Sequence, residues 1–287
     1  MEYAQKSARL PRSAEEKARW RRVIVILEHC PLRTIQTDRG FELLSDRHRA
    51  YHARHNQDPA DWRPDVVHQC LLHLQDSALN RAGMLEVFLR TTKQVCIAVD
   101  PRLRVPRNVR LFEKMMVSLL FKLKVRASIG YLSLLRVVGN PITDHIPAGA
   151  RLYRVEKDGD LVDPFTFCAS CGYAADVAEE QRVDRTISRA RRRLTSSTSG
   201  ALAETAAEAG TAAFASAQRA AVERRQFQPF AFIIGGMSRG DVTVDYARPG
   251  EVSSIRLGDR GMSAAAVIST LLHGFEEEWL REDNEAC

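Results

Sequence analysis

Apolar residues in this chain fall into short continuous runs that alternate with longer stretches of helical spacing. The runs are rich in β-branched residues, and continuous runs of this kind are typical of strands buried on both faces of a sheet. The predicted strands cover residues 23–27 (VIVIL), 85–91 (LEVFLRT), 95–100 (VCIAVD), 229–234 (PFAFII), 242–247 (VTVDYA) and 252–257 (VSSIRL).

Other stretches place apolar residues three or four positions apart, which predicts amphipathic helices. The predicted helices begin at Asp65 and cover 108–124 and 263–280, with weaker candidates around 40–53 and at 130–138. Pro64 suits a first helical turn, and Ser263 is expected to cap the last helix. Strands that alternate with helices favour an α/β domain with a mainly parallel sheet.

Composition divides the chain into four segments. We expect a polar arm at 1–22, the first part of the folded core at 23–157, a low-complexity segment at 158–226 and the second part of the core at 227–287. Residues 158–226 contain a basic run followed by a region rich in Ala, Ser, Thr and Gly. Such a composition offers few large apolar side chains to bury, so we interpret this segment as an insertion.

Charge and cysteine content limit the class of protein only loosely. The chain has 42 Lys and Arg against 36 Asp and Glu, a net charge of +6, which permits a nucleic-acid partner without requiring one. No run approaches the roughly 20 apolar residues of a membrane span, and the N-terminal stretch lacks the apolar segment of a secretory signal. We therefore expect an intracellular protein with reduced cysteines. Cys168 and Cys171 form a single CxxC, too few ligands for a structural zinc, and we expect no metal.

Two glycine-rich segments in the last third could form a ligand site. Gly235 and Gly240 are five positions apart, as in a phosphate-binding loop, but Asp241 and Val242 stand where that motif requires Lys and Ser or Thr. Hydrolysis of nucleoside triphosphates is therefore disfavoured. The second segment, 258–261, separates the last strand from the last helix. Together the two could wrap a small molecule with backbone groups, although each could equally be a plain turn.

A cluster of arginines and one aspartate form the other candidate site. Arg102, Arg104, Arg107 and Arg110 are spread around two prolines, so they should point to several sides. That arrangement suits a curved phosphate backbone, with a merely solvated surface as the alternative. Asp65, at a helix start, could be a helix cap or could accept a hydrogen bond from a substrate N–H.

Several long blocks carry a resemblance to a known family. RPDVVHQCLLHLQDSALNRAG, VDPRLRVPR, NPITDHIP, GGMSRG and SAAAVISTLLHGFEEEW occur in order over roughly 20–157 and 228–280. In these blocks the chain resembles the small-subunit ribosomal RNA pseudouridine N1-methyltransferases, the nucleolar essential protein family of the SPOUT methyltransferases. The resemblance implies a SPOUT fold, with a parallel sheet flanked by helices and a C-terminal trefoil knot. It also implies a homodimer, S-adenosyl-L-methionine bound by the knot loops, and a place in the nucleolus of the nucleus.

The same resemblance assigns site residues. Asp65 falls at the acidic site residue of the family, and the RNA contacts fall at Arg63, Arg104 and Arg107, with Arg110 standing in for a basic residue that is replaced by Leu111. The cofactor contacts fall at Gly235, Gly240, Leu257, Gly258, Asp259, Arg260, Gly261 and Met262. The last four depart from the Asn-Tyr-Pro-Leu-like pattern of the family, which affects side-chain contacts more than backbone contacts.

The expected reaction is methyl transfer to N1 of a pseudouridine in small-subunit rRNA, within pre-ribosomal particles. The arginines would hold phosphates while the target base leaves its stack. Asp65 would hydrogen-bond the pyrimidine edge, and because nearby arginines should lower its pKa, we favour positioning over proton abstraction. Two alternatives stay open: a non-catalytic RNA-binding ribosome-assembly factor, and a methyltransferase of another RNA such as tRNA.

Overall fold

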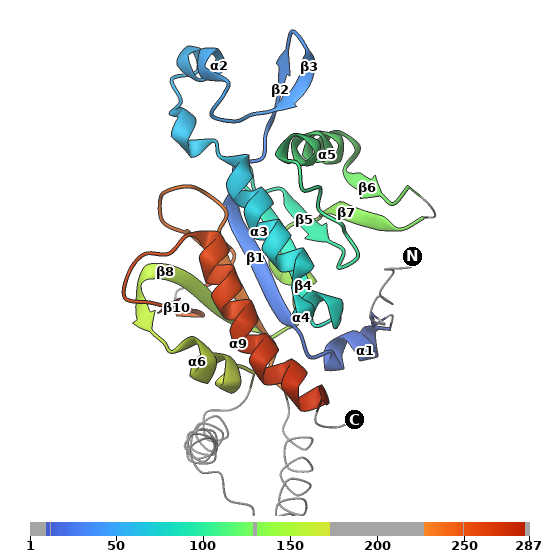
Figure 1. Ribbon diagram of the computed structural model, residues 1–287, viewed down its shortest axis with the longest axis vertical. Helices are drawn as coiled ribbons and strands as arrows, with labels where there is room; N and C mark the ends of the chain where they lie inside the picture. Colours follow the sequence, from blue (N-terminus) through green and yellow to red (C-terminus); the bar gives the residue numbers. More distant parts are fainter. Residues whose placement is uncertain (1–9, 12, 129–130, 173–226, 249, 285–287) are drawn as a thin grey trace, which may run out of the picture.

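The computed structural model describes residues 10–11, 13–128, 131–172, 227–248 and 250–284. Among these residues, eight strands form a central sheet (Figure 1). In spatial order they are β10 (Val252–Arg256), β8 (Arg151–Leu161), β9 (Phe230–Gly235), β1 (Val23–Cys30), β4 (Leu85–Thr91), β5 (Cys96–Val99), β7 (Ser133–Val138) and β6 (Lys124–Arg126). The strands from β10 to β4 pair in parallel, and β5, β7 and β6 add antiparallel pairs. The predicted α/β class with a mostly parallel sheet is thus confirmed.

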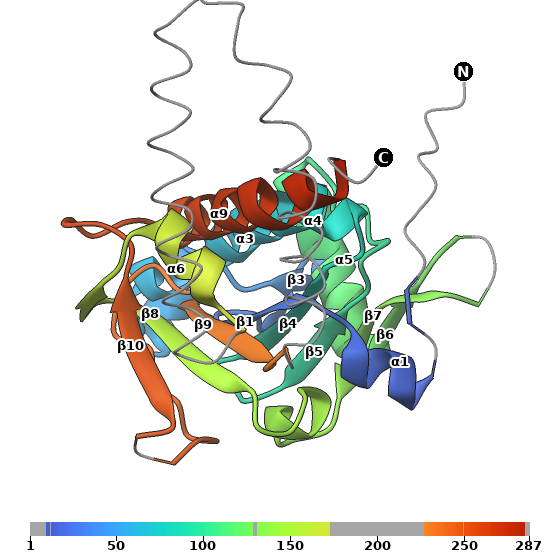
Figure 2. The same cartoon turned by 90° about the horizontal axis from the view of Figure 1, so that it is seen from below.

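Helices cover one face of this sheet (Figure 2). They are α3 (Pro64–Asp76), α4 (Ala78–Arg81), α5 (Val109–Lys122), α6 (Pro164–Ser170) and α9 (Ala264–Asn284). The core beneath them is partly aromatic, since the ring of Phe275 lies 5.5 Å from Phe230 and 5.0 Å from Trp279. Pro64 and Ser263 take the predicted positions: Pro64 is the first residue of α3, and the Ser263 hydroxyl accepts from the Ala266 amide at 3.3 Å.

The opposite face of the sheet is covered by irregular chain. A smaller apolar cluster there includes Ile24, Ile26 and Ile233, packed against the 3-10 helix η2 (Ile142–His145) and the segment 242–247. The strand predicted at 242–247 is wrong. Its alternating residues Val242, Val244 and Tyr246 do face the sheet, but the segment lies over the face instead of pairing at an edge. Burial of the central strands on both faces explains their continuous apolar runs.

Two predicted helices are also wrong. Residues 133–138 form β7, because pairing with both β5 and β6 outweighs the helical preference of the leucines. The region 40–53 begins with β3 (Gly40–Leu43), which forms a hairpin with the preceding β2 (Thr34–Thr37), and only its end is helical, as α2 (Arg49–Arg54). Gly40 permits the turn because its φ of +105° is poorly tolerated by other residues.

The N-terminal arm is partly docked. Helix α1 (Ala14–Arg19) starts with a capping box between Ser13 and Glu16. Beyond it, Trp20 Nε1 donates to the Gly83 carbonyl at 2.7 Å, and Arg22 pairs with Glu86. Part of the segment expected as a polar arm therefore belongs to the folded body, while residues 1–9 lie outside the described part.

The folded core also extends past the expected boundary at 158. Strand β8 continues to Leu161, and α6 packs on α9 with Cys168, Ala169 and Cys171 buried. Burial raises the pKa of both thiols, which keeps them protonated. Among the described residues no three His, Cys, Asp or Glu side chains are grouped to hold a metal, and no described helix has the length and apolarity to cross a bilayer. Residues 173–226, the rest of the expected insertion, lie outside the described part.

Candidate functional site

The site begins at the carboxyl ends of the parallel strands. Strand β9 pairs with β1 so that Gly235 lies opposite Glu28, and the first glycine loop, residues 235–241, starts there. The Gly236 amide donates to the Glu28 carbonyl at 2.6 Å. A Cβ on Gly236 would lie 2.7 Å from Cys30 Sγ, so no larger residue fits without movement. Ligand sites of open α/β sheets occur at the carboxyl ends of the strands.

The first glycine loop is tied to the segment that precedes α3. Ser238 Oγ donates to the Ala60 carbonyl at 2.5 Å, and Arg239 Nε donates to Asp61 at 2.7 Å. Arg239 also pairs with Asp58, whose pKa is lowered by the Ala60 amide and by this guanidinium. These contacts fix the loop on the 3-10 helix η1 (Pro59–Asp61), which leads directly to the start of α3. We call them the η1 tether.

Arg63 and Asp65 form an ion pair at the start of α3. Arg63 Nε lies 2.9 Å from Asp65 Oδ1, and a terminal nitrogen lies 2.6 Å from Oδ2, so the pair is bidentate. The Asp65 side chain is 33% exposed, and its hydrogen bonds with Arg63 lower its pKa. The helix cap is Arg63 itself, without a side-chain cap, so the interpretation of Asp65 as the cap is wrong. Asp65 is an ionised acceptor that Arg63 holds in one orientation.

The arginines after β5 lie on an ordered loop, residues 101–108, which we call the arginine loop. Leu103 and Val105 are buried, so the residues between and beside them point outward. His68 Nε2 lies 2.7 Å from the Pro106 carbonyl oxygen, to which it donates, and this contact fixes the loop to α3. His68 therefore has a structural role, since it holds the arginine loop on α3.

The four arginines differ in their partners. Arg102 is engaged by Asp100 at 2.8 Å, and Arg107 pairs with Asp76 at 2.6 Å although its side chain is 74% exposed. Arg104 and Arg110 are exposed and form no ion pair with any residue that the structure describes. Arg104 and Arg110 are thus free to meet a phosphate, whereas Arg107 would have to exchange its partner.

The second glycine loop, residues 257–262, joins β10 to α9. Strand β10 is parallel to β8, and β8 is parallel to β9. The second glycine loop therefore follows the carboxyl end of its strand on the same side of the sheet as the first glycine loop. Leu257 is buried and anchors the loop, while Asp259, Arg260, Gly261 and Met262 are exposed. Helices α3 and α9 pack together and begin at this end of the molecule (Figure 1). The structure therefore brings both glycine loops and the start of α3 to one end.

A buried ion network lies under the first glycine loop. Arg90, on β4, contacts Glu28 at 3.4 Å and Asp245 at 2.7 Å. Glu28 is fully buried, and this burial raises its pKa even though Arg90 opposes the effect. The network ties the chain that follows the loop to the end of β1.

Comparison with known proteins identifies the family. A family model described as "EMG1/NEP1 methyltransferase" matches residues 25–276. The chain belongs to this family. The resemblance inferred from the sequence blocks is therefore confirmed.

Relatives and a solved structure agree with this family. "Ribosomal RNA small subunit methyltransferase NEP1" of Mus musculus is 32% identical over 267 residues, which are 93% of this chain and 85% of the mouse protein. The Drosophila melanogaster protein of the same name is 43% identical over 143 residues, 50% of this chain and 57% of the fly protein. Archaeoglobus fulgidus Nep1, solved with bound S-adenosylhomocysteine, has a TM-score of 0.54 at 18% identity, with 89% of this chain and 98% of that chain covered. At that identity the match shows the fold.

For this member of the EMG1/NEP1 family, sequence reasoning missed several residues of the site. Gly236 is the most tightly confined glycine of the first loop, whereas a Cβ on Gly235 would meet Val242 at 3.1 Å. The η1 tether through Ser238 and Arg239 was not expected, and neither was buried Glu28. The paired glycines after a strand were the one sequence signal that could have pointed to Gly236. The others depend on segments that are distant in sequence.

Proposed function

We propose that this protein transfers the methyl group of S-adenosyl-L-methionine to N1 of a pseudouridine in small-subunit rRNA. The observation that carries the proposal is the η1 tether, which links the first glycine loop to the Arg63–Asp65 pair. A loop suited to a cofactor is thereby held beside a basic and acidic pair suited to a base. Family membership and the rRNA methyltransferase names of the mouse and fly relatives support the same reaction.

The glycine loops fit the cofactor. A Cβ on Gly261 would meet no atom within 4 Å, and one on Gly240 would meet only Met237 at 3.9 Å. These glycines therefore border open space, which backbone groups can share with a ligand. Gly235, Gly240 and the second glycine loop, from Leu257 through Met262, would hold S-adenosyl-L-methionine, whose sulfonium supplies an activated methyl group. The bound S-adenosylhomocysteine of the archaeal structure, which is the demethylated form of that cofactor, supports this assignment.

The protein residues would position the base and its proton. N1 of pseudouridine carries a proton, so it becomes a good nucleophile only as that proton leaves. The Asp65 carboxylate would accept a hydrogen bond from the ring edge, and Arg63 would hold that carboxylate ionised and oriented. A carboxylate with a lowered pKa is a weak base, so positioning is its main contribution. Arg63, Arg104, Arg107 and Arg110 would bind the phosphates around the displaced base.

Three finer features complete the proposal. We propose a trefoil knot at the C-terminal end, because α9 returns from the sheet-edge strand β10 to pack over the central strands. We propose a homodimer, supported by a hollow of about 470 Å³ between α3 and α9 that a second copy could cover. We propose a nucleolar location, because small ribosomal subunits are assembled there and small-subunit rRNA is the proposed substrate.

The reaction can be tested with matched RNA oligonucleotides. Wild-type protein should methylate a small-subunit rRNA hairpin that contains pseudouridine and should leave unmodified the same hairpin with uridine at that position. It should also bind S-adenosyl-L-methionine in calorimetry. Gly236→Val should lose cofactor binding, whereas Gly139→Ala, at a position with no atom within 4 Å, should retain it. RNA binding without cofactor binding or methylation by the wild-type protein would favour the non-catalytic assembly factor. Methylation of tRNA in preference to rRNA would favour the other alternative.

A further inference from the structure

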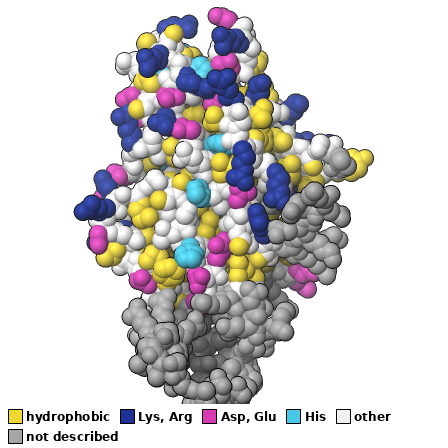
Figure 3. Space-filling model, viewed as in Figure 1, with side chains coloured by type: hydrophobic (Ala, Val, Ile, Leu, Met, Phe, Trp, Pro, Cys, Tyr) yellow, Lys and Arg dark blue, Asp and Glu magenta, His cyan; other side chains and the backbone are white. Residues whose placement is uncertain are grey.

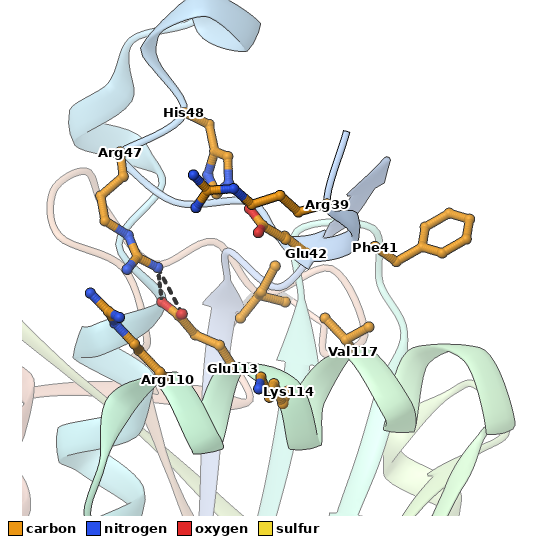
Figure 4. A pocket seen from close by; sticks show the side chains of 10 residues that line it. Arg39, Phe41, Glu42, Arg47, His48, Arg110, Glu113, Lys114 and Val117 are labelled. Carbon is orange, nitrogen blue, oxygen red and sulfur yellow. Dashed lines mark hydrogen bonds and ion pairs between the residues drawn. The ribbon is translucent and has the colours of Figure 1, made fainter. Parts of the chain in front are cut away.

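A groove separates the β2–β3 hairpin from α5 (Figure 4). Its volume is about 530 Å³, and its lining includes Arg39, Phe41, Arg47, Arg110, Glu113 and Lys114. Arg47 and Arg110 lie at one end and Phe41 at the other. The groove is distinct from the two glycine loops, none of whose residues line it.

The groove has an excess of positive charge that its own acids do not neutralise. Glu113 is bound by Arg47 through two contacts of 2.6 and 2.7 Å, and Glu42 is bound by His48 at 2.9 Å. Arg39, Arg110 and Lys114 form no ion pair with the described residues. Both carboxylates of the lining are therefore engaged, and three cations remain for an anionic partner.

An exposed aromatic pair lies at the far end. Phe41 is 54% exposed and Phe121 is 51% exposed, and their rings meet edge to face with centroids 4.5 Å apart. The contact holds the Phe41 ring in place and leaves part of it open to solvent. A held, exposed ring beside unpaired cations is the combination that binds unpaired nucleotides, because every base has a face that can stack.

The groove continues the surface of the arginine loop. That loop ends at Asn108, the cap of α5, and Arg110 lies in the first turn that follows. On the other side, Arg47 donates to Ser45 Oγ at 3.3 Å, and the Asp46 amide donates to the Trp62 carbonyl at 2.9 Å, one residue before Arg63. In Figure 3, Lys and Arg side chains gather over this upper part of the molecule. An RNA strand that leaves the Arg63–Asp65 pair can therefore enter the groove without leaving basic surface.

We propose that this groove binds single-stranded nucleotides that flank the target pseudouridine. Arg39, Arg110 and Lys114 contact phosphates, and one base stacks on Phe41. The inference rests on the proposed function for the identity of the RNA. Its contacts come from residues outside the expected RNA set, with Arg110 shared. An acidic protein segment is the competing partner, and it would use the cations without requiring an aromatic face.

Equilibrium binding to three RNAs tests this inference. One is a minimal hairpin whose loop contains the target, and the other two carry about six additional unpaired nucleotides, one on the 5′ side and one on the 3′ side. Wild-type protein should bind one of the extended RNAs about tenfold more tightly, the gain of one stacked base and its phosphates. Phe41→Ala and Lys114→Gln should each remove most of that gain, and Phe41→Tyr should keep it. Lys122→Gln is the matched control, since this exposed lysine lies on the same helix outside the groove.

The outcomes separate the groove from the reaction. Equal affinity of the wild-type protein for all RNAs, or an unchanged gain in Phe41→Ala with a normal melting curve, would overturn the inference. Poly-glutamate that displaces the extended RNA as well as poly-uridine does would assign the groove to an acidic protein segment instead. Because binding is measured without cofactor, failure of methylation on all three RNAs would count against the proposed function alone.

Discussion

Arg63 and Asp65 show how two neighbouring residues acquire one role. The family resemblance implied that Arg63 contacts RNA and that Asp65 meets the base, and the structure joins the two residues in a bidentate pair. A phosphate bound by Arg63 would therefore share its guanidinium with Asp65, whose carboxylate this guanidinium keeps ionised. Substitutions at either position should affect the orientation of the base.

We predict that Asp65→Asn lowers the single-turnover methylation rate by about 10²-fold, because a neutral amide loses the bidentate pair with Arg63 and is a weaker acceptor for the base. RNA affinity and melting temperature should stay near wild type. Asp158→Asn, at an exposed site on β8, serves as the control. A wild-type rate in a folded, RNA-binding Asp65→Asn protein would limit Asp65 to a structural role.

Buried Glu28 gives a second prediction, on the pH dependence of stability. Burial raises its pKa above the value of about 4.5 in the unfolded chain. The unfolded chain therefore loses this proton first, and the stability contributed by Glu28 is full below about pH 4.5 and falls as pH rises through the folded pKa. The free energy of unfolding falls over this pH range by an amount that depends on the difference between the folded and unfolded pKa values of Glu28. Each tenfold difference in proton affinity between the two states corresponds to about 1.4 kcal/mol.

Glu28→Gln should remove that decline, while Arg90 keeps its partner Asp245. Urea unfolding from pH 4.5 to 8 measures the difference between wild type and variant, with exposed Glu251→Gln as the control. An identical pH profile for Glu28→Gln and wild type would show that the carboxyl titrates normally in the folded protein.

At the scale of elements, the η1 tether determines where the first glycine loop lies. Its ion pairs are exposed, so they contribute little to global stability. Their effect is local, because they reduce the freedom that the loop would otherwise lose when a ligand binds. A cofactor loop fixed by the segment before α3 also couples the two halves of the site.

We predict that Arg239→Gln weakens S-adenosyl-L-methionine binding about fivefold while the melting temperature changes little, because the loop must then be ordered on binding. Asp61→Asn should have a similar effect, and the double variant should be no worse than either single variant. Calorimetry on the three variants measures this coupling. Fully additive losses would show that Arg239 and Asp61 act on the cofactor independently.

The elements that could be predicted from sequence are those whose own residues decide them. Strand β1 is buried on both faces, so its continuous apolar run is visible in the sequence, and α3 and α9 have clear apolar stripes. The prediction for β7 was wrong because its partners β5 and β6 decide its conformation. Segment 242–247 has the alternation of a strand, but its apolar residues pack on the face of the sheet and the segment pairs with no described strand. In the same way, Asp58 and Asp61 reveal their role only once the glycine loop lies beside them.

At the scale of the whole molecule, the alternation of strands and helices predicted the α/β class. The site residues were assigned from the family resemblance and not from periodicity. The boundary of the insertion was less predictable. The α6 sequence is rich in small and aromatic residues, and only its packing against α9 shows that it belongs to the core: a Cβ on Gly274 would lie 2.8 Å from Cys168 Sγ. The insertion in this fold must therefore begin after α6.

The described residues that flank segment 173–226 contact one another, which leads to the last prediction. The Gln228 amide donates to the Gly172 carbonyl at 2.8 Å, and a Cβ on Gly172 would collide with the Phe227 ring. A short Gly-Ser linker can therefore replace residues 174–225 without displacing either end. We propose that this segment is an insertion, and we expect the shortened protein to keep its melting temperature within a few degrees and to retain methyl transfer.

Deletion of residues 165–222 is the informative comparison, because it also removes buried Cys168 and the rest of α6. That variant should fail to fold, since α9 would lose its packing against α6 and the buried Cys168. Circular dichroism melting and methylation of the pseudouridine hairpin, measured on both proteins, test the boundary. If the 174–225 replacement unfolds as well, residues beyond α6 contribute to the core. If it folds but no longer methylates, the segment acts in the reaction and is more than an insertion.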